Sequence, residues 1–371
     1  QELIAKTRSL YIYDKAEDSV AANLMTVVKL VKEKMDVCML MNFFPFREAD
    51  IFSYTRLVLV YTEKVYPYKK SLYYASALHY AGWLYNVSED IPKRKLCFDT
   101  AIAIRLQKLG RENIVYAESL IDQATLFYHY GHTQVALLKI QVALKIMKKS
   151  GIPDSIAYAN CMMTAAAVYS KEQKYTIALN YFDSATAIWE KLALNRNPLY
   201  ALYISKIALL NDEMSQYTIA LARFRKAMDI TEAAFGKNNM QYLWCLNGKS
   251  EMLYRLGQYE ASLDNCKEIL AICDNNKEMK FSSLPLFLSN TATTYIKMGE
   301  YSKALPLLQE ALKVEESLDE KDPVSSTYFN FHLASLYIQI GQYDEALGVI
   351  RQSLYMMEVH HRTYDRVYSR L

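Results

Sequence analysis

The stretch Leu256–Cys266, LGQYEASLDNC, recurs almost unchanged at two later places in the chain. MGEYSKALPLL begins at Met298 and IGQYDEALGVI begins at Ile340, so each copy starts 42 residues after the previous one. A fixed period of about 20–50 residues is the sequence signature of a repeat protein, in which each unit packs against its neighbours. The sequence therefore predicts a linear array of units rather than one closed core.

The same period extends through seven copies with no insertion or deletion. One column late in each copy sets the register, and it holds a small residue in every copy except the fifth: Ala101, Ala143, Ala185, Ala227, Ile269, Ala311 and Ser353. An aromatic residue follows the turn in the five later copies, at Tyr175, Tyr217, Tyr259, Tyr301 and Tyr343. A second column of small residues lies three positions further on, at Ala136, Ala178, Ala220, Ser262, Ala304 and Ala346. The only exception is the first copy, which carries Arg94 at this position. Agreement in several columns at one spacing predicts one structural unit per copy.

Each unit is predicted to be a pair of helices. Apolar residues at i, i+3, i+4 and i+7 lie on both sides of the Gly-x-Tyr step, which indicates two amphipathic helices joined by a tight turn. The small columns lie where two helix backbones would touch, because a larger residue there would overpack the contact at about 1–3 kcal/mol. Turn formers are scarce, with 10 Gly and 8 Pro in 371 residues, which also favours a mostly helical chain.

The charge and hydropathy of the chain exclude two classes of protein. The 43 basic and 40 acidic residues give a net charge of +3 and form no run, which does not fit a nucleic-acid-binding protein. The most apolar stretch, MDVCMLMNFF at Met35–Phe44, is about half of what a helix needs to cross a bilayer. We therefore expect neither a nucleic-acid partner nor a membrane span.

The cysteines are predicted to be free thiols, mostly buried in helices. They form no CxxC pair and are scattered at Cys38, Cys97, Cys161, Cys245, Cys266 and Cys273. Free buried thiols are typical of a reducing compartment, which favours the cytoplasm. The sequence starts at Gln1 without Met, which also fits export after removal of a signal peptide, so the location stays open.

The repeat pattern resembles the tetratricopeptide repeat (TPR), in the 42-residue variant that is similar to kinesin light chain. The resemblance covers residues 75–354 and rests on the order of small, turn, aromatic and small positions in an unbroken register. It implies an all-α solenoid of seven repeats coiled into a right-handed superhelix. The expected domains are an N-terminal helical cap with a divergent repeat (residues 1–74), the seven repeats (75–354) and a C-terminal helical extension (355–371).

No catalytic or metal-binding motif is present in the sequence. The histidines have no carboxylate or cysteine partner at ligand spacing, and they lie at His79, His129, His132, His332, His360 and His361. The HExxH and GxSxG motifs, a phosphate-binding glycine loop and the dinucleotide-binding fingerprint do not occur in it. We therefore predict a protein that is not an enzyme and that needs neither metal nor cofactor.

The resemblance implies a concave groove lined by the first helix of each repeat. In related proteins, asparagines in this groove hold a peptide backbone, and Asn247 and Asn290 occupy the matching positions. Trp244 and Tyr254 would then be anchors, while Arg255 and Lys297 would favour an acidic segment. The predicted partner-binding residues are Trp244, Asn247, Glu251, Tyr254, Arg255, Ser289, Asn290, Lys297, His332 and Gln339. The alternative for each of them is a solvated or repeat-packing role.

Three functions follow from this interpretation. The first is a non-catalytic scaffold that binds a peptide or partner protein in the groove, centred on residues 240–340. The second is the sensory or regulatory arm of a larger protein, since the array is similar to those that precede caspase-like CHAT protease domains in bacterial proteins. The third is a receptor of the peptide-pheromone type. The sequence leaves the partner and the oligomeric state open.

Overall fold

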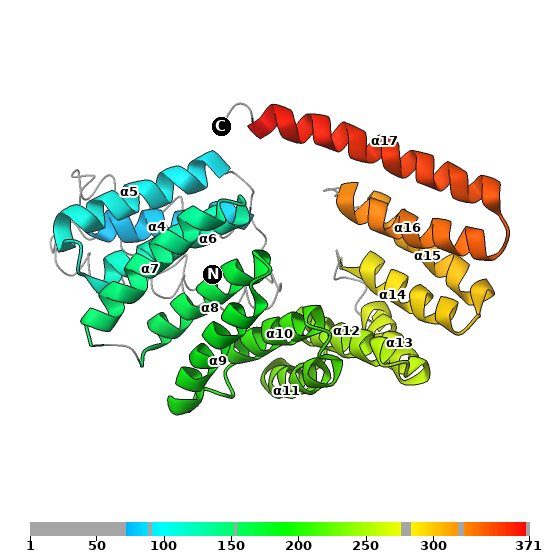
Figure 1. Ribbon diagram of the computed structural model, residues 1–371, viewed down its shortest axis with the longest axis horizontal. Helices are drawn as coiled ribbons and strands as arrows, with labels where there is room; N and C mark the ends of the chain where they lie inside the picture. Colours follow the sequence, from blue (N-terminus) through cyan, green and yellow to red (C-terminus); the bar gives the residue numbers. More distant parts are fainter. Residues whose placement is uncertain (1–71, 88–90, 152–153, 276–282, 318–322, 369–371) are drawn as a thin grey trace, which may run out of the picture. The chain divides into compact units, whose positions relative to one another are not determined.

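The computed structural model describes residues 72–87, 91–151, 154–275, 283–317 and 323–368. These residues form fourteen helices, and no strand occurs among them. The described part of the chain is therefore all-α, and its helices follow one another as a TPR-type solenoid (Figure 1). Most of the predicted N-terminal cap lies outside the described residues, and the domain boundaries at residues 74 and 354 stay predictions.

The helices alternate between a first and a second helix of each repeat. The first helices are α4 (Leu72–Val87), α6 (Ile114–His129), α8 (Ile156–Lys171), α10 (Pro198–Glu213), α12 (Met240–Arg255), α14 (Leu284–Lys297) and α16 (Pro323–Gln339). The second helices are α5 (Ile91–Leu109), α7 (Thr133–Lys149), α9 (Tyr175–Lys191), α11 (Tyr217–Phe235), α13 (Tyr259–Asn275), α15 (Tyr301–Ser317) and α17 (Tyr343–Tyr368). Every second helix begins 42 residues after the previous one, on the column that carries tyrosine in the five later copies. The predicted helix pair is therefore confirmed.

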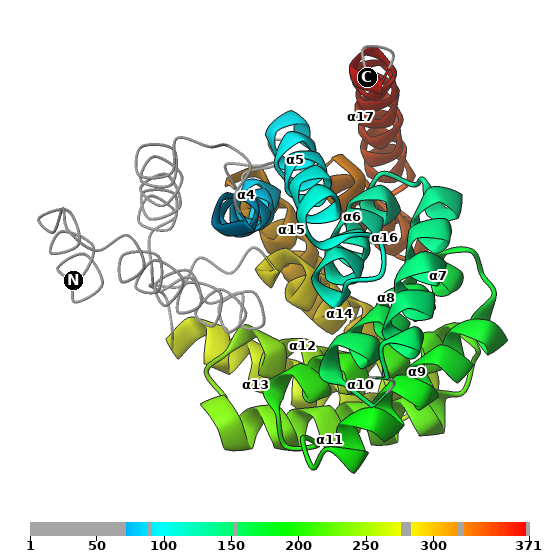
Figure 2. The same ribbon diagram turned by 90° about the vertical axis from the view of Figure 1, so that its left-hand side faces the viewer.

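The chain divides into two compact units, and the boundary between them along the sequence falls within α10. Unit 1 extends to Leu210, and in its described part the pairs α4–α5, α6–α7 and α8–α9 pack in succession. Unit 2 begins at Asn211, and from α11 to α17 each helix packs on the next. In unit 2 the first helices also contact one another, α12 with α14 and α14 with α16. The succession of helices within each unit can be followed from two directions (Figure 1 and Figure 2).

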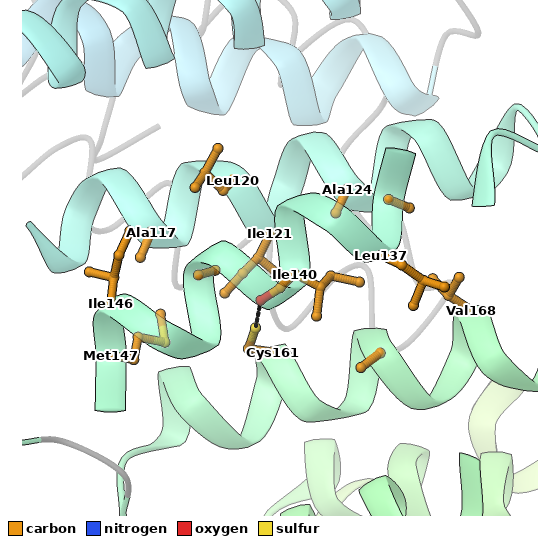
Figure 3. Close-up of a cluster of buried hydrophobic side chains, with 13 residues drawn as sticks. Ala117, Leu120, Ile121, Ala124, Leu137, Ile140, Ile146, Met147, Cys161 and Val168 are labelled. Atoms are coloured by element: carbon orange, nitrogen blue, oxygen red, sulfur yellow. Dashed lines mark hydrogen bonds between the residues drawn. The ribbon is translucent and has the colours of Figure 1, made fainter. Parts of the chain in front are cut away.

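The small-residue column is buried where neighbouring helices meet. Six of its members are no more than 1% exposed, namely Ala101, Ala143, Ala185, Ala227, Ile269 and Ala311. Figure 3 shows one such contact in unit 1, where residues of α6, α7 and α8 form a single apolar cluster. Small side chains let the helix backbones approach closely, so the predicted role of this column is confirmed.

The described cysteines are buried and free, as predicted. In the cluster of Figure 3, the Cys161 thiol donates to the carbonyl oxygen of Ile140 over 3.9 Å. Burial raises the pKa of Cys161 to about 12, so this thiol stays protonated and unreactive near neutral pH. The other described cysteines are also free and buried, and they are Cys97, Cys245, Cys266 and Cys273. Cys38 lies outside the described residues.

Among the described turns between paired helices, two carry a side chain at the position where the other four carry glycine. Gly257 and Gly299 adopt φ 76°, in the left-handed region, and at the matching positions Gln173 and Ser215 adopt φ 58°. Side chains disfavour this conformation by about 1–2 kcal/mol per residue. These two turns are therefore strained.

Replacing Gln173 or Ser215 with glycine is expected to stabilise the protein by up to about 1 kcal/mol each. Relief of the left-handed strain outweighs the about 0.4–1 kcal/mol by which glycine favours the unfolded chain. Urea denaturation followed by circular dichroism measures the change. Gln258→Gly is the control, since Gln258 lies just after the turn and has no positive φ. An equal gain in the control would show that strain is not the cause.

Candidate partner-binding face

The first helices of unit 2 form the face on which the predicted binding residues lie. Helices α12, α14 and α16 contact one another in this order, and Figure 1 shows α14 and α16 side by side. Asn239 fixes the start of α12, because its side-chain oxygen accepts from the Tyr242 backbone N–H over 2.9 Å. Such a cap satisfies a backbone N–H of the first turn and so stabilises the start of the helix.

Aromatic side chains on these helices are exposed to solvent. Trp244 on α12 is 39% exposed, and Tyr328 and Phe331 on α16 are 43% and 68% exposed. The Phe287 and Trp244 ring centres lie 5.9 Å apart in an edge-to-face arrangement, and those of His332 and Tyr328 lie 4.6 Å apart in the same arrangement. Neighbouring rings therefore hold Trp244 and Tyr328 in place. Exposed and positioned aromatics are typical of an interaction surface. The predicted set omits Tyr328 and Phe331, although the repeat register places both in groove-lining positions.

The two predicted asparagine clamps bond to each other. The Asn290 side-chain amide donates to the Asn247 carbonyl oxygen over 2.9 Å, linking α14 to α12. Asn247 is buried, while Asn290 is half-buried. A side-chain amide has two donor hydrogens and an acceptor oxygen, so Asn290 keeps one N–H and its carbonyl oxygen for a ligand. The structure thus brings this pair together and leaves Asn290 as the accessible member.

Two polar atoms beneath this face have no hydrogen-bond partner. They are Ser289 Oγ on α14 and His332 Nε2 on α16, and both are buried. Ser289 is fully buried, so its hydroxyl does not reach the surface. Burial lowers the pKa of His332, which keeps its ring neutral at pH 7. Its other nitrogen, Nδ1, lies 3.5 Å from Thr293 Oγ1.

Charged groups lie at one end of α12. Arg255 and Glu251 form an ion pair of 3.3 Å that is partly exposed to solvent, where such a pair contributes about 0–1 kcal/mol. Burial, and then the charge of Glu251, raise the pKa of Asp212 at the end of α10, while Arg255 opposes this shift. The Tyr254 ring lies 5.7 Å from that of Tyr259. These groups give the face an edge that can pair with charges of either sign.

The remaining predicted residues are Lys297 and Gln339, and both are exposed at the last residue of their first helix. No group of three metal-ligating side chains occurs among the described residues. In the same part of the chain, no helix combines the length and the hydropathy that crossing a membrane requires. The face can therefore offer aromatic surface, one amide and paired charges.

Models of known families match parts of the chain. Tetratricopeptide repeat models match residues 157–233 and 198–275, and a second such model matches residues 288–322 and 331–358. A model of anaphase-promoting complex subunit 5 matches residues 95–168. No curated protein matches the chain. Both units thus contain sequence of the tetratricopeptide-repeat type, and the chain is a tetratricopeptide-repeat solenoid.

Solved structures share this fold at low sequence identity. A Rap protein complexed with Competence and Sporulation Factor is 15% identical, with a TM-score of 0.64, and the match covers 96% of this chain and 98% of the other. The STAND protein PH0952 from Pyrococcus horikoshii, which has a tetratricopeptide repeat sensor, is 14% identical with a TM-score of 0.61. The match covers 96% of this chain and 56% of the other.

Nearly identical TPR-like repeats from Podosopora anserina, described as kinesin light chain, are 14% identical with a TM-score of 0.50, covering 56% of this chain and 99% of the other. Identities this low show a common fold alone. The association with CHAT protease domains and a bacterial source stay predictions.

Proposed function

We propose that this protein is an interaction scaffold and that unit 2 binds an extended peptide segment of a partner protein across α12, α14 and α16. The observation that carries the proposal is the exposure of Trp244, Tyr328 and Phe331 on these helices. Large exposed apolar side chains that share neighbouring helices are typical of protein-interaction sites, whereas singly scattered ones are not. Stacked helix pairs present extended surfaces of this kind to peptides and partner helices.

The contacts on this face support a division of roles. Phe331 and Trp244 supply large apolar surface at a low entropic cost, which is typical of residues that dominate binding energy. Asn290 offers an N–H and a carbonyl oxygen to the backbone of an extended chain. Arg255 and Lys297 favour a carboxylate at one end of the segment, and Glu251 holds Arg255 in place.

A regulatory or receptor role is the second candidate. The Rap structure that matches nearly the whole chain contains a bound factor, and the repeats of PH0952 are described as a sensor. Both likenesses extend over 96% of this chain, which favours binding of a signal by the entire array. In this second role the peptide would be free rather than part of a partner protein.

A selection from a random peptide library displayed on phage tests the binding face. Fluorescence anisotropy then measures the Kd of each selected peptide for the wild type and for Trp244→Ala and Phe331→Ala. We expect at least tenfold weaker binding in either variant, about 1.4 kcal/mol, because the lost ring is an anchor. Ile219→Ala removes an apolar side chain that is 46% exposed on α11 and should leave the Kd unchanged.

Two outcomes would contradict the proposal. One is equal Kd values for the wild type and both aromatic variants. The other is a selection that yields no binding peptide, or only peptides for which the aromatic variants compete as well as the wild type does. A selected peptide that binds as a free hexamer and also as part of a larger protein supports the scaffold. A peptide that binds only with both of its termini free supports the receptor.

A further inference from the structure

Helix α7 carries apolar side chains on two different faces. Its inner face packs within unit 1 and is at most 1% exposed, at Ala136, Ile140, Ala143 and Met147. Figure 3 shows Ile140 and Met147 inside the apolar cluster that α7 shares with α6 and α8. Turned away from this cluster, Val135, Leu138 and Val142 are 39%, 64% and 48% exposed. A surface helix normally carries polar side chains on its outer face, so this second apolar face needs a separate explanation.

The packing of the repeats does not account for these exposed apolar side chains. The position of Val142 is polar in every other copy, at Thr100, Ser184, Lys226, Glu268, Glu310 and Gln352. The position of Leu138 is again leucine in the first copy but holds no large apolar residue in the five later ones, at Asn180, Ala222, Asp264, Pro306 and Gly348. Copies without this apolar face form the same helix pair, so the pair does not need it.

The exposed side chains follow the spacing of a contact between two helices. Val135, Leu138 and Val142 are three and then four residues apart, and Lys145 and Lys149 continue this spacing. Positions spaced in this way form one line along a helix, and a second helix packs along such a line in a coiled coil. Two-stranded coiled coils favour β-branched residues and leucine in alternation there, which is the order found on α7. The exposed line on α7 therefore fits one further helix.

Basic side chains occupy the second half of the same side of α7. Lys145, Lys148 and Lys149 are exposed, and α7 contains no Asp or Glu. Lys149 pairs with Glu112 at the surface, where such a pair contributes about 0–1 kcal/mol. Lys145 and Lys148 form no ion pair with any described residue. A partner with carboxylates at this end is therefore favoured over a partner with basic residues.

Two other occupants fit this surface less well. A second copy of the chain would bring its own α7, which has no carboxylate to pair with the lysines. A membrane surface attracts lysines, but helices that lie on membranes usually carry aromatic anchors, and α7 has no aromatic residue. An acidic helix of another protein matches both the apolar half and the basic half of the surface.

We propose that the outer face of α7, defined as Val135, Leu138, Val142, Lys145 and Lys148, binds one amphipathic helix of a partner protein. The apolar side chains of that helix pack on the first half of the outer face, and its acidic side chains pair with the lysines of the second half. The outer face belongs to a second helix of unit 1, whereas the aromatic face lies on first helices of unit 2. The inference therefore goes beyond the proposed function and does not rest on it.

A phage-displayed library of 21-residue helical peptides tests the proposal by selection on the wild-type protein. The positions that follow the three-and-four spacing vary among Ala, Val, Ile and Leu, and the positions beside them vary among Glu, Gln and Lys. We expect Glu to be enriched over Lys beside the apolar line in one half of the selected peptides. Equal use of Glu and Lys, or a selection that yields no binding peptide, would overturn the proposal.

Fluorescence anisotropy then locates the bound peptide, with the fluorescein-labelled selected peptide as the probe. We expect the double variant Leu138→Gln, Val142→Gln to weaken binding at least tenfold. Ile219→Gln is the matched control, because Ile219 holds the position of Val135 on α11 and is 46% exposed, but has no apolar residue at the other two positions of the line except Ala222. Its Kd should equal that of the wild type, as should the Kd of Trp244→Ala in unit 2.

The basic half has a separate pair of variants. We expect Lys145→Gln, Lys148→Gln to weaken binding at least threefold at low salt, and less at high salt, where the charges are screened. Lys267→Gln, Lys313→Gln makes the same change in net charge at exposed positions of α13 and α15 and should bind as the wild type does. All of these side chains are exposed, so the thermal midpoints should stay unchanged. If the apolar double variant lowers the midpoint, the lysine double variant decides.

Three results would overturn the assignment to a partner helix. One is an unchanged Kd in both the apolar and the lysine double variants. Another is a wild-type dimer in light scattering that Leu138→Gln, Val142→Gln converts to a monomer, which would assign the outer face to a second copy. The third is co-sedimentation with vesicles of phosphatidylserine and phosphatidylcholine that the same double variant abolishes, which would assign it to a membrane surface.

Discussion

Replacing Trp189 with alanine is expected to lower the free energy of unfolding by about 3–5 kcal/mol, the usual range for a buried tryptophan. Trp189 on α9 is 1% exposed, and its ring lies 5.6 Å from Tyr203 and 6.4 Å from Tyr200 on α10. Tyr203 in turn donates to Asn160 on α8 over 2.8 Å. The substitution would thus leave a cavity where three helices of unit 1 meet.

Urea denaturation followed by circular dichroism measures this loss, and Trp244→Ala is the matched control. Trp244 is the same residue type but is 39% exposed, so its removal should change the free energy of unfolding by less than about 1 kcal/mol. The two variants should therefore separate cleanly, with Trp189→Ala losing stability and Trp244→Ala losing peptide binding. Equal destabilisation by both would contradict the burial that distinguishes them.

The second large effect is expected at Gly248, where alanine should destabilise unit 2 by about 2–3 kcal/mol. A Cβ atom at this position on α12 would lie 2.4 Å from Cε1 and Cζ of Phe224, a distance that real Cβ atoms do not show. Phe224 is itself buried on α11, so its ring has little room to move aside. The overpacking penalty then exceeds the about 1 kcal/mol that alanine gains over glycine in a helix.

A double-mutant cycle with Phe224→Leu checks the cause. Leucine removes the ring atoms that clash, so Gly248→Ala should cost much less in the Phe224→Leu background than in the wild type. Gly348→Ala on α17 is the control, because a Cβ there meets nothing within 4 Å and should stabilise the helix. Additive effects of the two substitutions would rule out the proposed clash.

The repeat register predicted most of the fold because one physical requirement recurs in every unit. A small residue is needed wherever two helix backbones touch, so Ala143 and Ala227 mark the same contact in different repeats. The aromatic column marks the first residue of each second helix, from Tyr175 in α9 to Tyr343 in α17. The small and aromatic columns reflect contacts between residues that are near in sequence, and so the repeat pattern alone predicts them.

The side chains of the binding face were less predictable because their surroundings come from the next repeat. Register alone places Asn247 and Asn290 on one face, but the rotation between repeats decides that they bond to each other. The same rotation buries Ser289 and exposes Phe331, both in the same slot of successive repeats. Arg94 was visible in the sequence as a misfit of its column, and only packing shows that its donors are unmatched.

The constant interval between second helices has a consequence for how such a protein can change over time. Each junction between neighbouring pairs within a unit is built from the same columns, and stability in such stacks is close to a sum over the junctions. A gene that gains or loses one whole copy would therefore lengthen or shorten the interaction surface while the surviving contacts stay as they were. The length of the interaction surface could then change during evolution without any change in the residues that determine ligand specificity.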